Sequence, residues 1–539
     1  MIESDHFSFG RPPDRLSLVD MGTPPSDAQS SEPTHVRFIV LGFICALSLL
    51  TYLDRVCIMR VSSMMSEELG FDTSGIQMGA VFSAFLLGYA LFEVPSGWMG
   101  DVWGPRRVLT RIVLWWSAFT VLTGCVFSFE VSSAHQFVLF GYSIISSFGL
   151  LMAVRFFFGA GEAGAYPNIT RVTGVWFPVR ERAVAQGAVW MAARLGGALA
   201  PPVMGALSSS TRFGWRGAFW ILGGLGLIWA AAFRLWFRDR PGDSPHCNAA
   251  ERSLIRDDNP SFRPAKASNS GSFGHREPAE ETGFTPAGSI QSASDPSFKS
   301  ASVSGEVHAN QPGNQAADPN PEESSHHAMP PIGTLLSSVT VWAMAVAAFA
   351  VCFGWYFYPT WQPKYLQEAF GIPYENSEFL TGLPFLCGAA GAILGGWLSD
   401  RLVVRTGSRR WGRSLVGLVG FSGAGLCVLG TGFATQPWQA VTLLCLAFFI
   451  NDLAIPTLWA SFADVGGRFV GTLSGLMNMI GAIGGGLAPV LIPIVLKQFD
   501  HLPTTVRWQY IFSGMASAWF IAAAAWLFID AGKPLAKRH

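Results

Sequence analysis

The sequence predicts an all-α membrane protein with twelve transmembrane helices in two six-helix bundles. Half of the 539 residues are hydrophobic and only 13% are charged, a composition typical of chains that cross a bilayer many times. The apolar residues gather into stretches of about 20 residues, long enough to cross the hydrocarbon core. Short motifs also recur at matching places in the two halves, which indicates a parallel duplication.

Several function classes are excluded by composition and motifs. The formal net charge is zero, so we expect no nucleic-acid partner. The eight cysteines form no CxxC pair and no Cys/His cluster, and therefore indicate neither a metal site nor a disulfide framework. No nucleophile triad or phosphate loop is present. We expect no cofactor and no enzymatic activity.

The chain divides into five segments by polarity. Residues 1–35 are predicted to be a disordered tail, 36–237 a first bundle, 238–333 a disordered linker, 334–530 a second bundle and 531–539 a tail. Within the linker, Asn248 to Ile255 is compatible with a short amphipathic turn. The first bundle has predicted spans at 37–65, 76–99, 107–128, 142–167, 184–208 and 216–237. The second has spans at 338–360, 378–399, 413–432, 437–462, 470–496 and 507–530.

Charge asymmetry of the loops predicts the orientation. With both tails inside, the inner loops contain Arg106, Arg107, Arg111, Arg171, Arg180, Arg182, Arg401, Arg405, Arg409, Arg410 and Arg413. The outer loops contain Glu67, Glu68, Asp72, Glu130, Glu368 and Glu375. Because inner loops are rich in Lys and Arg, we predict a multi-pass protein of the cell membrane, the inner membrane if the source is Gram-negative, with both termini cytoplasmic.

Two motifs occur in both halves. Gly97-Trp98-Met99-Gly100-Asp101 ends the second predicted span, and Gly396-Trp397-Leu398-Ser399-Asp400-Arg401 ends the eighth. Gly196-Gly197-Ala198-Leu199-Ala200-Pro201 is likewise echoed by Gly484-Gly485-Gly486-Leu487-Ala488-Pro489. We interpret Asp101 and Asp400 as residues that cap and latch cytoplasmic helix ends beside arginines.

The fourth predicted span, which includes the segment from Arg155 to Pro167, carries one arginine and one glutamate among apolar residues and glycines. In a helix Arg155 and Glu162 would lie about two turns, or roughly 10 Å, apart on one face. Charges inside a bilayer usually face the bundle interior or a water-filled cavity. Our hypothesis is that Arg155 holds an anion and Glu162 carries a proton. The alternative is that both only pair with charges on neighbouring helices.

The chain resembles the major facilitator superfamily. The motif Gly97-x-x-x-Asp101-x-x-Gly104-x-Arg106-Arg107 is similar to its loop signature, although Val102 stands where a basic residue is usual. Tyr52-Leu53-Asp54-Arg55, the segment from Arg155 to Pro167, and Trp176-Phe177-Pro178-x-x-Glu181-Arg182-Ala183 resemble the anion:cation symporter family, with its bacterial galactonate and hexuronate permeases and animal vesicular glutamate and sialic acid carriers. The resemblance covers about 36–240 and 335–530.

The resemblance implies roles for individual residues. Asp54 and Glu162 match the proton-coupling acids, and Arg155 matches the arginine that holds the substrate carboxylate. Arg55 matches the arginine beside the first acid. Tyr89 matches a cavity tyrosine, and Asn478 matches a polar residue of the wall in the second half.

Three further residues concern the substrate cavity. Arg194 stands where sugar-acid permeases of this family have a neutral hydrogen-bonding side chain, and Arg60 is an uncommon charge after Asp54. An extra buried arginine favours a more negative or differently shaped substrate, or neutralises Glu162. We place Tyr356 at the cavity rather than in the interfacial aromatic belt.

The predicted function is therefore secondary active transport of a small organic anion, such as a hexuronate, a galactonate or another carboxylate. We expect proton symport by alternating access, with a protein that functions as a monomer. The alternatives are an anion exchanger, a sodium-coupled or potential-driven carrier, and a membrane sensor that binds the anion without moving it.

Overall fold

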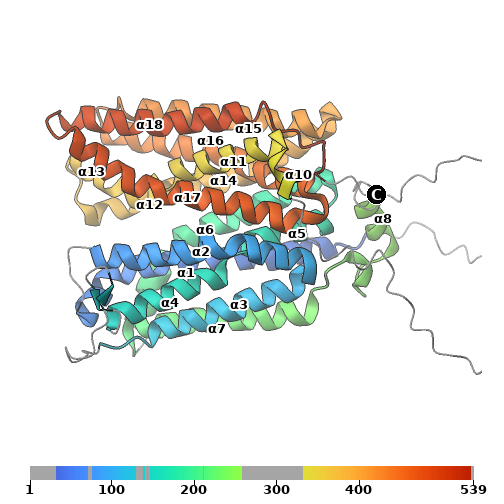
Figure 1. The fold of residues 1–539 in the computed structure, drawn as a ribbon, viewed down its shortest axis with the longest axis horizontal. Helices are drawn as coiled ribbons and strands as arrows, with labels where there is room; N and C mark the ends of the chain where they lie inside the picture. Colours follow the sequence, from blue (N-terminus) through green and yellow to red (C-terminus); the bar gives the residue numbers. More distant parts are fainter. Residues whose placement is uncertain are drawn as a thin grey trace, which may run out of the picture.

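The computed structural model describes residues 32–70, 76–128, 138–139, 142–143, 146–210, 212–257 and 332–535. Predictions for residues 1–31, 258–331 and 536–539, and for Asp72 and Glu130, lie outside the described residues. The described chain forms two bundles of long helices that lie side by side (Figure 1).

The first bundle contains the helices up to α7. They are α1 (Val36–Leu69), α2 (Ile76–Trp103), α3 (Pro105–Gly124), α4 (Ser147–Glu162), α5 (Ala165–Trp176), α6 (Arg182–Ser210) and α7 (Gly214–Trp236). Before α4, the short strands β1 (Val138–Leu139) and β2 (Tyr142–Ser143) pair antiparallel. The predicted start of the fourth span at residue 142 is therefore wrong. The helix begins at Ser147. Ser146 is its N-cap, and the Ser146 side chain accepts a hydrogen bond from the amide of Gly149 (3.1 Å).

The second bundle contains α11 to α18. Its helices are α11 (Val339–Trp355), α12 (Phe357–Thr360), α13 (Gln362–Phe370), α14 (Tyr374–Thr406), α15 (Arg409–Thr431), α16 (Pro437–Gly466), α17 (Val470–Gln498) and α18 (Thr504–Ala525). Short elements flank the long helices of both bundles. The 3₁₀ turn η2 (Val179–Glu181) precedes α6 and η3 (Pro241–Asp243) follows α7, whereas α10 (Ile332–Leu336) precedes α11 and η6 (Gly467–Phe469) precedes α17.

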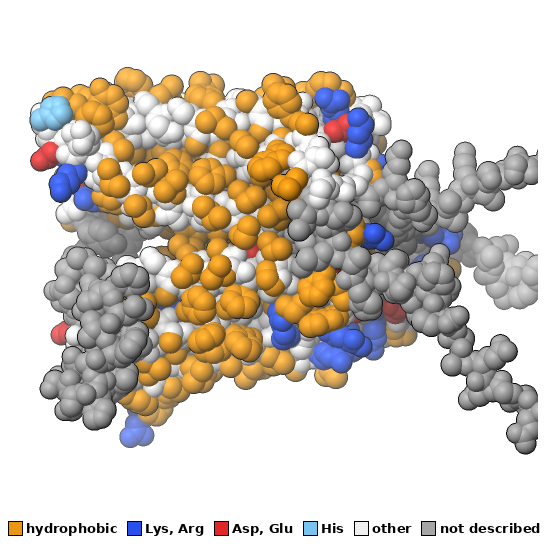
Figure 2. All heavy atoms as spheres, in the orientation of Figure 1, with side chains coloured by type: hydrophobic (Ala, Val, Ile, Leu, Met, Phe, Trp, Pro, Cys, Tyr) orange, Lys and Arg blue, Asp and Glu red, His pale blue; other side chains and the backbone are white. Residues whose placement is uncertain are grey.

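If α4–α5 and α11–α13 are each counted as one interrupted span, the described helices give six spans in each bundle. The predicted fold class is confirmed. Among the described residues, length and mean hydropathy identify eight helical stretches that are long and apolar enough to cross a membrane, and one of them, Pro437–Gln498, covers both α16 and α17. Hydrophobic side chains cover the long sides of the bundles, while Lys and Arg gather mainly at the two ends (Figure 2).

The segment from Arg155 to Pro167 is not one helix. Gly164 separates α4 from α5 with a left-handed φ of 84°, and a Cβ placed there would lie 2.3 Å from the Cβ of Ser96 on α2. Only glycine suits both the backbone angle and the close contact. Arg155 and Glu162 still share α4, and Pro167 lies in the first turn of α5, where its missing N–H is not needed.

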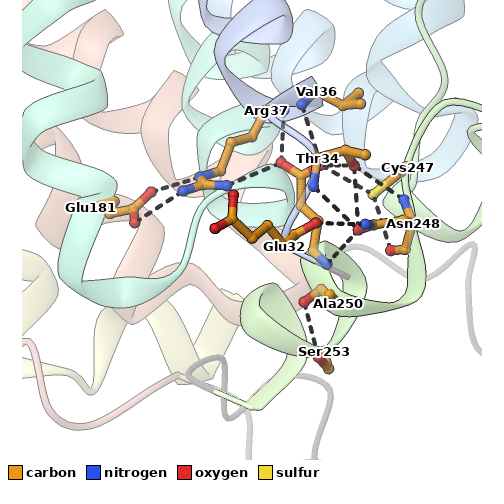
Figure 3. Close-up of polar contacts among 10 residues, drawn as sticks. Glu32, Thr34, Val36, Arg37, Glu181, Cys247, Asn248, Ala250 and Ser253 are labelled. Atoms are coloured by element: carbon orange, nitrogen blue, oxygen red, sulfur yellow. Dashed lines mark hydrogen bonds and ion pairs between the residues drawn. The ribbon is translucent and has the colours of Figure 1, made fainter. Parts of the chain in front are cut away.

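Part of the linker is ordered and docks on the first bundle. Helix α8 (Ala249–Asp257) presents Glu251, which is fully buried, to the first turn of α1. Figure 3 shows Thr34, Val36 and Arg37 beside Asn248 at this contact. The Glu251 carboxylate accepts hydrogen bonds from the hydroxyl of Thr34 (2.6 Å), the amides of Val36 (3.2 Å) and Arg37 (3.1 Å), and the Arg37 guanidinium (3.1 Å). The Arg37 Nε also donates to Glu181 (2.9 Å). We call the end of the molecule where α8 lies the linker end.

We expect Glu251→Ala to lower the free energy of unfolding by about 3 kcal/mol, because the first amides of α1 and a buried guanidinium lose their acceptor. Thermal unfolding of the purified protein in detergent, followed by tryptophan fluorescence, measures the change. Ser253→Ala is the control, since the Ser253 hydroxyl donates to Ala250 within α8 (2.9 Å). Equal melting temperatures for the two variants would contradict the assignment.

Candidate functional site

A cavity of about 90 Å³ lies between the two bundles. Residues of α1, α2, α5 and α6 line it from the first bundle, and residues of α11, α16 and α17 from the second. The predicted site residues on its wall are Arg55, Tyr89, Arg194, Tyr356 and Asn478. Much of the remaining wall is aromatic, formed by Tyr52, Tyr166, Trp190, Trp355, Trp459 and Phe462.

The first arginine of the cavity is paired with a buried acid. Arg55 on α1 donates to Glu162 at the end of α4, with 2.5 Å between Nη2 and Oε1. The Glu162 side chain is only 1% exposed, and its second oxygen has no hydrogen-bond partner within the described part of the chain. The Arg55 guanidinium also lies over the rings of Tyr89 (4.7 Å) and Tyr52 (5.3 Å). Glu162 therefore lies behind the cavity wall, and Arg55 separates it from the cavity.

Asp54 and Arg155 are buried away from the cavity lining. Asp54 accepts hydrogen bonds from the Trp116 indole (2.9 Å) and the Thr120 hydroxyl (3.5 Å). The guanidinium of Arg155 lies 4.2 Å from the centre of the Phe158 ring, and no residue that the structure describes forms a hydrogen bond with its Nε. Both residues interact electrostatically with Glu162. The sequence predicts that Arg155 holds the anion. In the structure, however, Arg55 lines the cavity and Arg155 is not among the lining residues.

The second arginine of the cavity is paired across the interface between the bundles. Arg194 on α6 donates to Asp452 on α16 through Nε (2.6 Å) and Nη2 (3.1 Å), a bidentate contact. The Arg194 side chain is 2% exposed and that of Asp452 is fully buried. The Asn451 side-chain amide donates a further hydrogen bond to Asp452 (2.9 Å). The sequence leaves open whether Arg194 serves the substrate or neutralises Glu162. In the structure Arg194 pairs with Asp452, and Glu162 pairs with Arg55.

Asn478 connects the bundles on another side of the cavity. Its amide donates to the Tyr89 hydroxyl (2.9 Å) and to Glu93 (2.7 Å), both on α2. Glu93 is fully buried. Sequence reasoning missed Glu93 and Asp452, although both are acids inside predicted spans, the same signal that selected Glu162.

At the linker end, Asp101 caps a helix of the opposite bundle. It accepts hydrogen bonds from the first-turn amides of α17, those of Gly471 (2.9 Å) and Thr472 (2.7 Å), and from the Thr472 hydroxyl (2.7 Å). Arg171 on α5 pairs with the same carboxylate (2.5 Å). An anionic acceptor at a helix N-terminus satisfies unpaired amides and interacts favourably with the helix dipole.

Asp400 repeats this arrangement in the other direction. It accepts hydrogen bonds from the first-turn amides of α6, those of Ala183 (3.2 Å) and Val184 (2.8 Å), and pairs with Arg413 (2.6 Å). Arg413 also contacts Asp464 (3.3 Å), which in turn pairs with Arg182 (2.7 Å). The duplicated motif therefore produces two matching caps between the bundles.

Glycines of the same motif permit these contacts. A Cβ on Gly97 would lie 2.2 Å from the carbonyl oxygen of Gly471, and one on Gly396 would lie 2.2 Å from that of Ala183. The backbones of α2 and α17, and of α14 and α6, can approach only without those side chains. Each aspartate then lies one turn further on, at the end of the facing helix.

The other residues of the loop signature, and Arg401 of its counterpart in the second half, have different contacts. We interpret the two motifs together as the cytoplasmic gate. The Arg106 guanidinium donates to the carbonyl of Arg234 (2.6 Å), Arg107 is exposed, and Arg401 lies over the ring of Trp397 (5.1 Å). Gly104 has a φ of 83° and leaves space for Asp239. Asp239 accepts a hydrogen bond from the Arg106 amide (2.7 Å), and burial raises the pKa of its carboxyl.

Ionisable side chains that meet at a cavity between two related helical bundles are typical of secondary transporters. Among the described residues, no group of three His, Cys, Asp or Glu side chains is placed to hold a metal ion. Residues 44–489 match the family model of the Major Facilitator Superfamily. The chain belongs to this superfamily of transporters and is a multi-pass membrane protein, not an enzyme.

Curated relatives cover most of the chain. It is 32% identical over 496 residues to the "Probable sulfoacetate transporter SauU" of Cupriavidus necator, which covers 92% of this chain and 94% of the relative. It is 27% identical to the "Probable galactarate/D-glucarate transporter GudP" of Escherichia coli (87% and 90% covered). It is 26% identical to the "D-galactonate transporter" of the same species (88% and 93% covered).

Solved structures share the fold. The proton:xylose symporter XylE matches with a TM-score of 0.61 and 12% identity, covering 93% of this chain and 97% of XylE. The human organic anion transporter MFSD10 matches with a TM-score of 0.56 and 13% identity, covering 92% of this chain and all of that one. At these identities the likeness concerns the fold alone.

We expect Asp101→Asn to weaken closure of the linker end by about 1–2 kcal/mol, because the cap of α17 and the partner of Arg171 lose their charge. Spin labels at Arg107 and Val404, exposed positions on opposite bundles, should then show a longer distance population by pulsed electron resonance. Asp239→Asn is the matched control, since Asp239 caps α3 within one bundle. An unchanged distance distribution in Asp101→Asn would show that the cap does not hold the end closed.

Proposed function

We propose that the protein is a proton-coupled symporter that carries a small organic anion across the cell membrane by alternating access. The observation that supports this best is the Arg55–Glu162 pair at the cavity wall. The names of three relatives give sulfoacetate, galactarate or D-glucarate, and D-galactonate as their substrates, all of them organic anions. Sugar acids and other small carboxylates or sulfonates are therefore the substrate class that we favour.

In this proposal, binding is an exchange of partners at Arg55. The planar guanidinium remains protonated and donates two parallel hydrogen bonds to a carboxylate or sulfonate. When the substrate takes the place of Glu162 at Arg55, the released carboxylate would be an unpaired buried charge, which is costly. Uptake of a proton by Glu162 removes that charge, so anion and proton bind together.

Asp54 and Arg155 complete the proposed proton site. Asp54 is held by Trp116 and Thr120 and interacts electrostatically with both Glu162 and Arg155. We assign Asp54 as a second proton-coupling acid. Arg155 then balances the two acids from behind the wall, and contact between Arg155 and the anion would require a more open state of the cavity.

Alternating access follows from the two caps at the linker end. The excess of arginines at this end supports a cytoplasmic location, which gives both termini a cytoplasmic position. In the described structure, Asp101 and Asp400 each cap a helix of the opposite bundle at this end, and in our proposal these caps keep the end closed. Release of both caps would let the bundles separate and open the cavity to the cytoplasm. Because both bundles and the cavity between them belong to one chain, we expect the monomer to function.

Uptake of labelled sulfoacetate, D-glucarate and D-galactonate into proteoliposomes, with and without an imposed pH gradient, tests the coupling. We expect accumulation that depends on the gradient, and we expect Glu162→Gln to abolish accumulation while leaving exchange of internal for external anion. Uptake indifferent to the pH gradient would favour the exchanger or the sodium-coupled carrier. Binding without uptake would favour the sensor.

A matched pair of variants tests which arginine holds the anion. We expect Arg55→Lys to weaken substrate binding by about tenfold or more, because lysine lacks the planar fork. Arg155→Lys should have a smaller effect on the dissociation constant, since Arg155 does not line the cavity. Isothermal titration of the purified variants measures both constants. A larger effect at Arg155 would restore the assignment made from the sequence.

A further inference from the structure

The cavity contains two arginines, and each has its own buried counter-ion. Arg55 is paired with Glu162 and Arg194 is paired with Asp452. Both arginines line the cavity, whereas neither acid is among the lining residues. The Tyr52 ring lies between the two arginines, with its centre 5.3 Å from the guanidinium carbon of Arg55 and 6.0 Å from that of Arg194. The two cationic groups therefore flank a single aromatic side chain.

We propose that Arg194–Asp452 is a second anion-exchange site and that the cavity selects a small dianion, one acid group of which binds each arginine. This inference rests on the proposed function and extends it to the substrate class. At present the two pairs have no net charge. A dianion that enters alone would add two negative charges to an apolar site, whereas a dianion that enters with two protons leaves the total unchanged.

The exchange at Arg194 mirrors that at Arg55. One acid group of the substrate takes the bidentate position of Asp452, and the Asp452 carboxylate takes up a proton from the external solution, relayed by the water that enters with the substrate. The O–H bond of this proton is the only covalent bond that forms. One nitrogen of Arg194, Nη1, is buried and has no hydrogen-bond partner among the described residues, so a donor is available before Asp452 is displaced. The rings of Trp355 (5.2 Å) and Trp190 (5.3 Å) hold the guanidinium beside the cavity.

Asp452 keeps a hydrogen-bond donor when Arg194 turns to the substrate. The Asn451 amide donates to it, and Trp519 on α18 fixes Asn451 by donating to its oxygen (3.0 Å). Among the described residues, Arg194 of α6 is the charged group that faces Asp452. The other titratable groups near the pair are Tyr358 of α12, Cys352 of α11, Tyr52 of α1 and Tyr166 of α5.

The second exchange has a mechanical consequence that the first does not have. Arg55 and Glu162 belong to one bundle, but Arg194 and Asp452 belong to opposite bundles. When a dianion binds Arg194, it removes an ion pair that joins the bundles beside the cavity. A monoanion that binds only Arg55 leaves that pair in place. The number of acid groups on the substrate thus determines whether binding loosens the interface.

Uptake of two matched substrate pairs tests the inference. Each pair contains a dianion and a monoanion of similar size: sulfoacetate with 2-hydroxyethanesulfonate, and D-glucarate with D-gluconate. We expect the wild type to prefer the dianion of each pair by about tenfold or more, the range for one charge-assisted contact. The double variant R194Q/D452N leaves no lone buried charge, and we expect its ratio of dianion to monoanion uptake to fall to about one.

Proton fluxes measured with the same vesicles provide a second readout. We expect one more proton to be taken up per dianion in the wild type than in the double variant, because the variant lacks Asp452. Arg216→Gln is the control, because Arg216 pairs with Glu68 outside the cavity and its loss should change neither value. Equal uptake of dianion and monoanion by the wild type, or an unchanged preference in the double variant, would overturn the inference but not the proposed function. Failure of the wild type to transport any of the four anions would instead count against the proposed function.

Discussion

The structure depends on one constraint, which is that a charge buried among apolar side chains must have a partner. Several of the described ion pairs that satisfy it lie where the two bundles meet, while Arg55–Glu162 lies within the first bundle. Arg194 pairs with Asp452 beside the cavity, and Arg413 with Asp464 and Asp400 at the linker end. The same charges that are costly inside a membrane protein therefore determine where its two halves meet.

Charge pairing alone would not align the bundles, and backbone dipoles supply the rest. Asp101 and Asp400 each lie at the end of one helix and cap the first turn of another in the opposite bundle. Gly97 and Gly396 bring those helices close enough for the caps to form. The duplicated sequence motif is thus one contact made twice, with the roles of the bundles exchanged. Its symmetry explains why the glycine and the aspartate occur together in both halves.

The sequence was informative about the types of residue at the site and less so about their partners. Tyr89, Asn478 and Arg55 were placed at the cavity from motifs, and they do line it. Asp452 was missed because its partner is 258 residues away, and no local pattern connects them. Periodicity put Arg155 and Glu162 on one face of α4, but it could not show that α1 brings Arg55 to Glu162. The break at Gly164 depends on contact with Ser96 of α2, another fact of tertiary packing.

The pairs at the cavity and the caps at the linker end differ in what can replace them. In our proposal a small anion reaches Arg55 and Arg194, because both line the cavity, whereas Asp101 and Asp400 bind helix ends that no substrate of that size resembles. A helix cap is worth about 1–2 kcal/mol, and a population shift from 1:99 to 99:1 requires about 5.5 kcal/mol. The stabilisation by two caps and their arginines is therefore of the same order as the free energy needed for such a shift. Preferential binding of an anion and its protons to one conformation can supply a free energy of this order. In the proposed transport cycle, closure of this kind would be strong enough to seal one end and weak enough to be reversed.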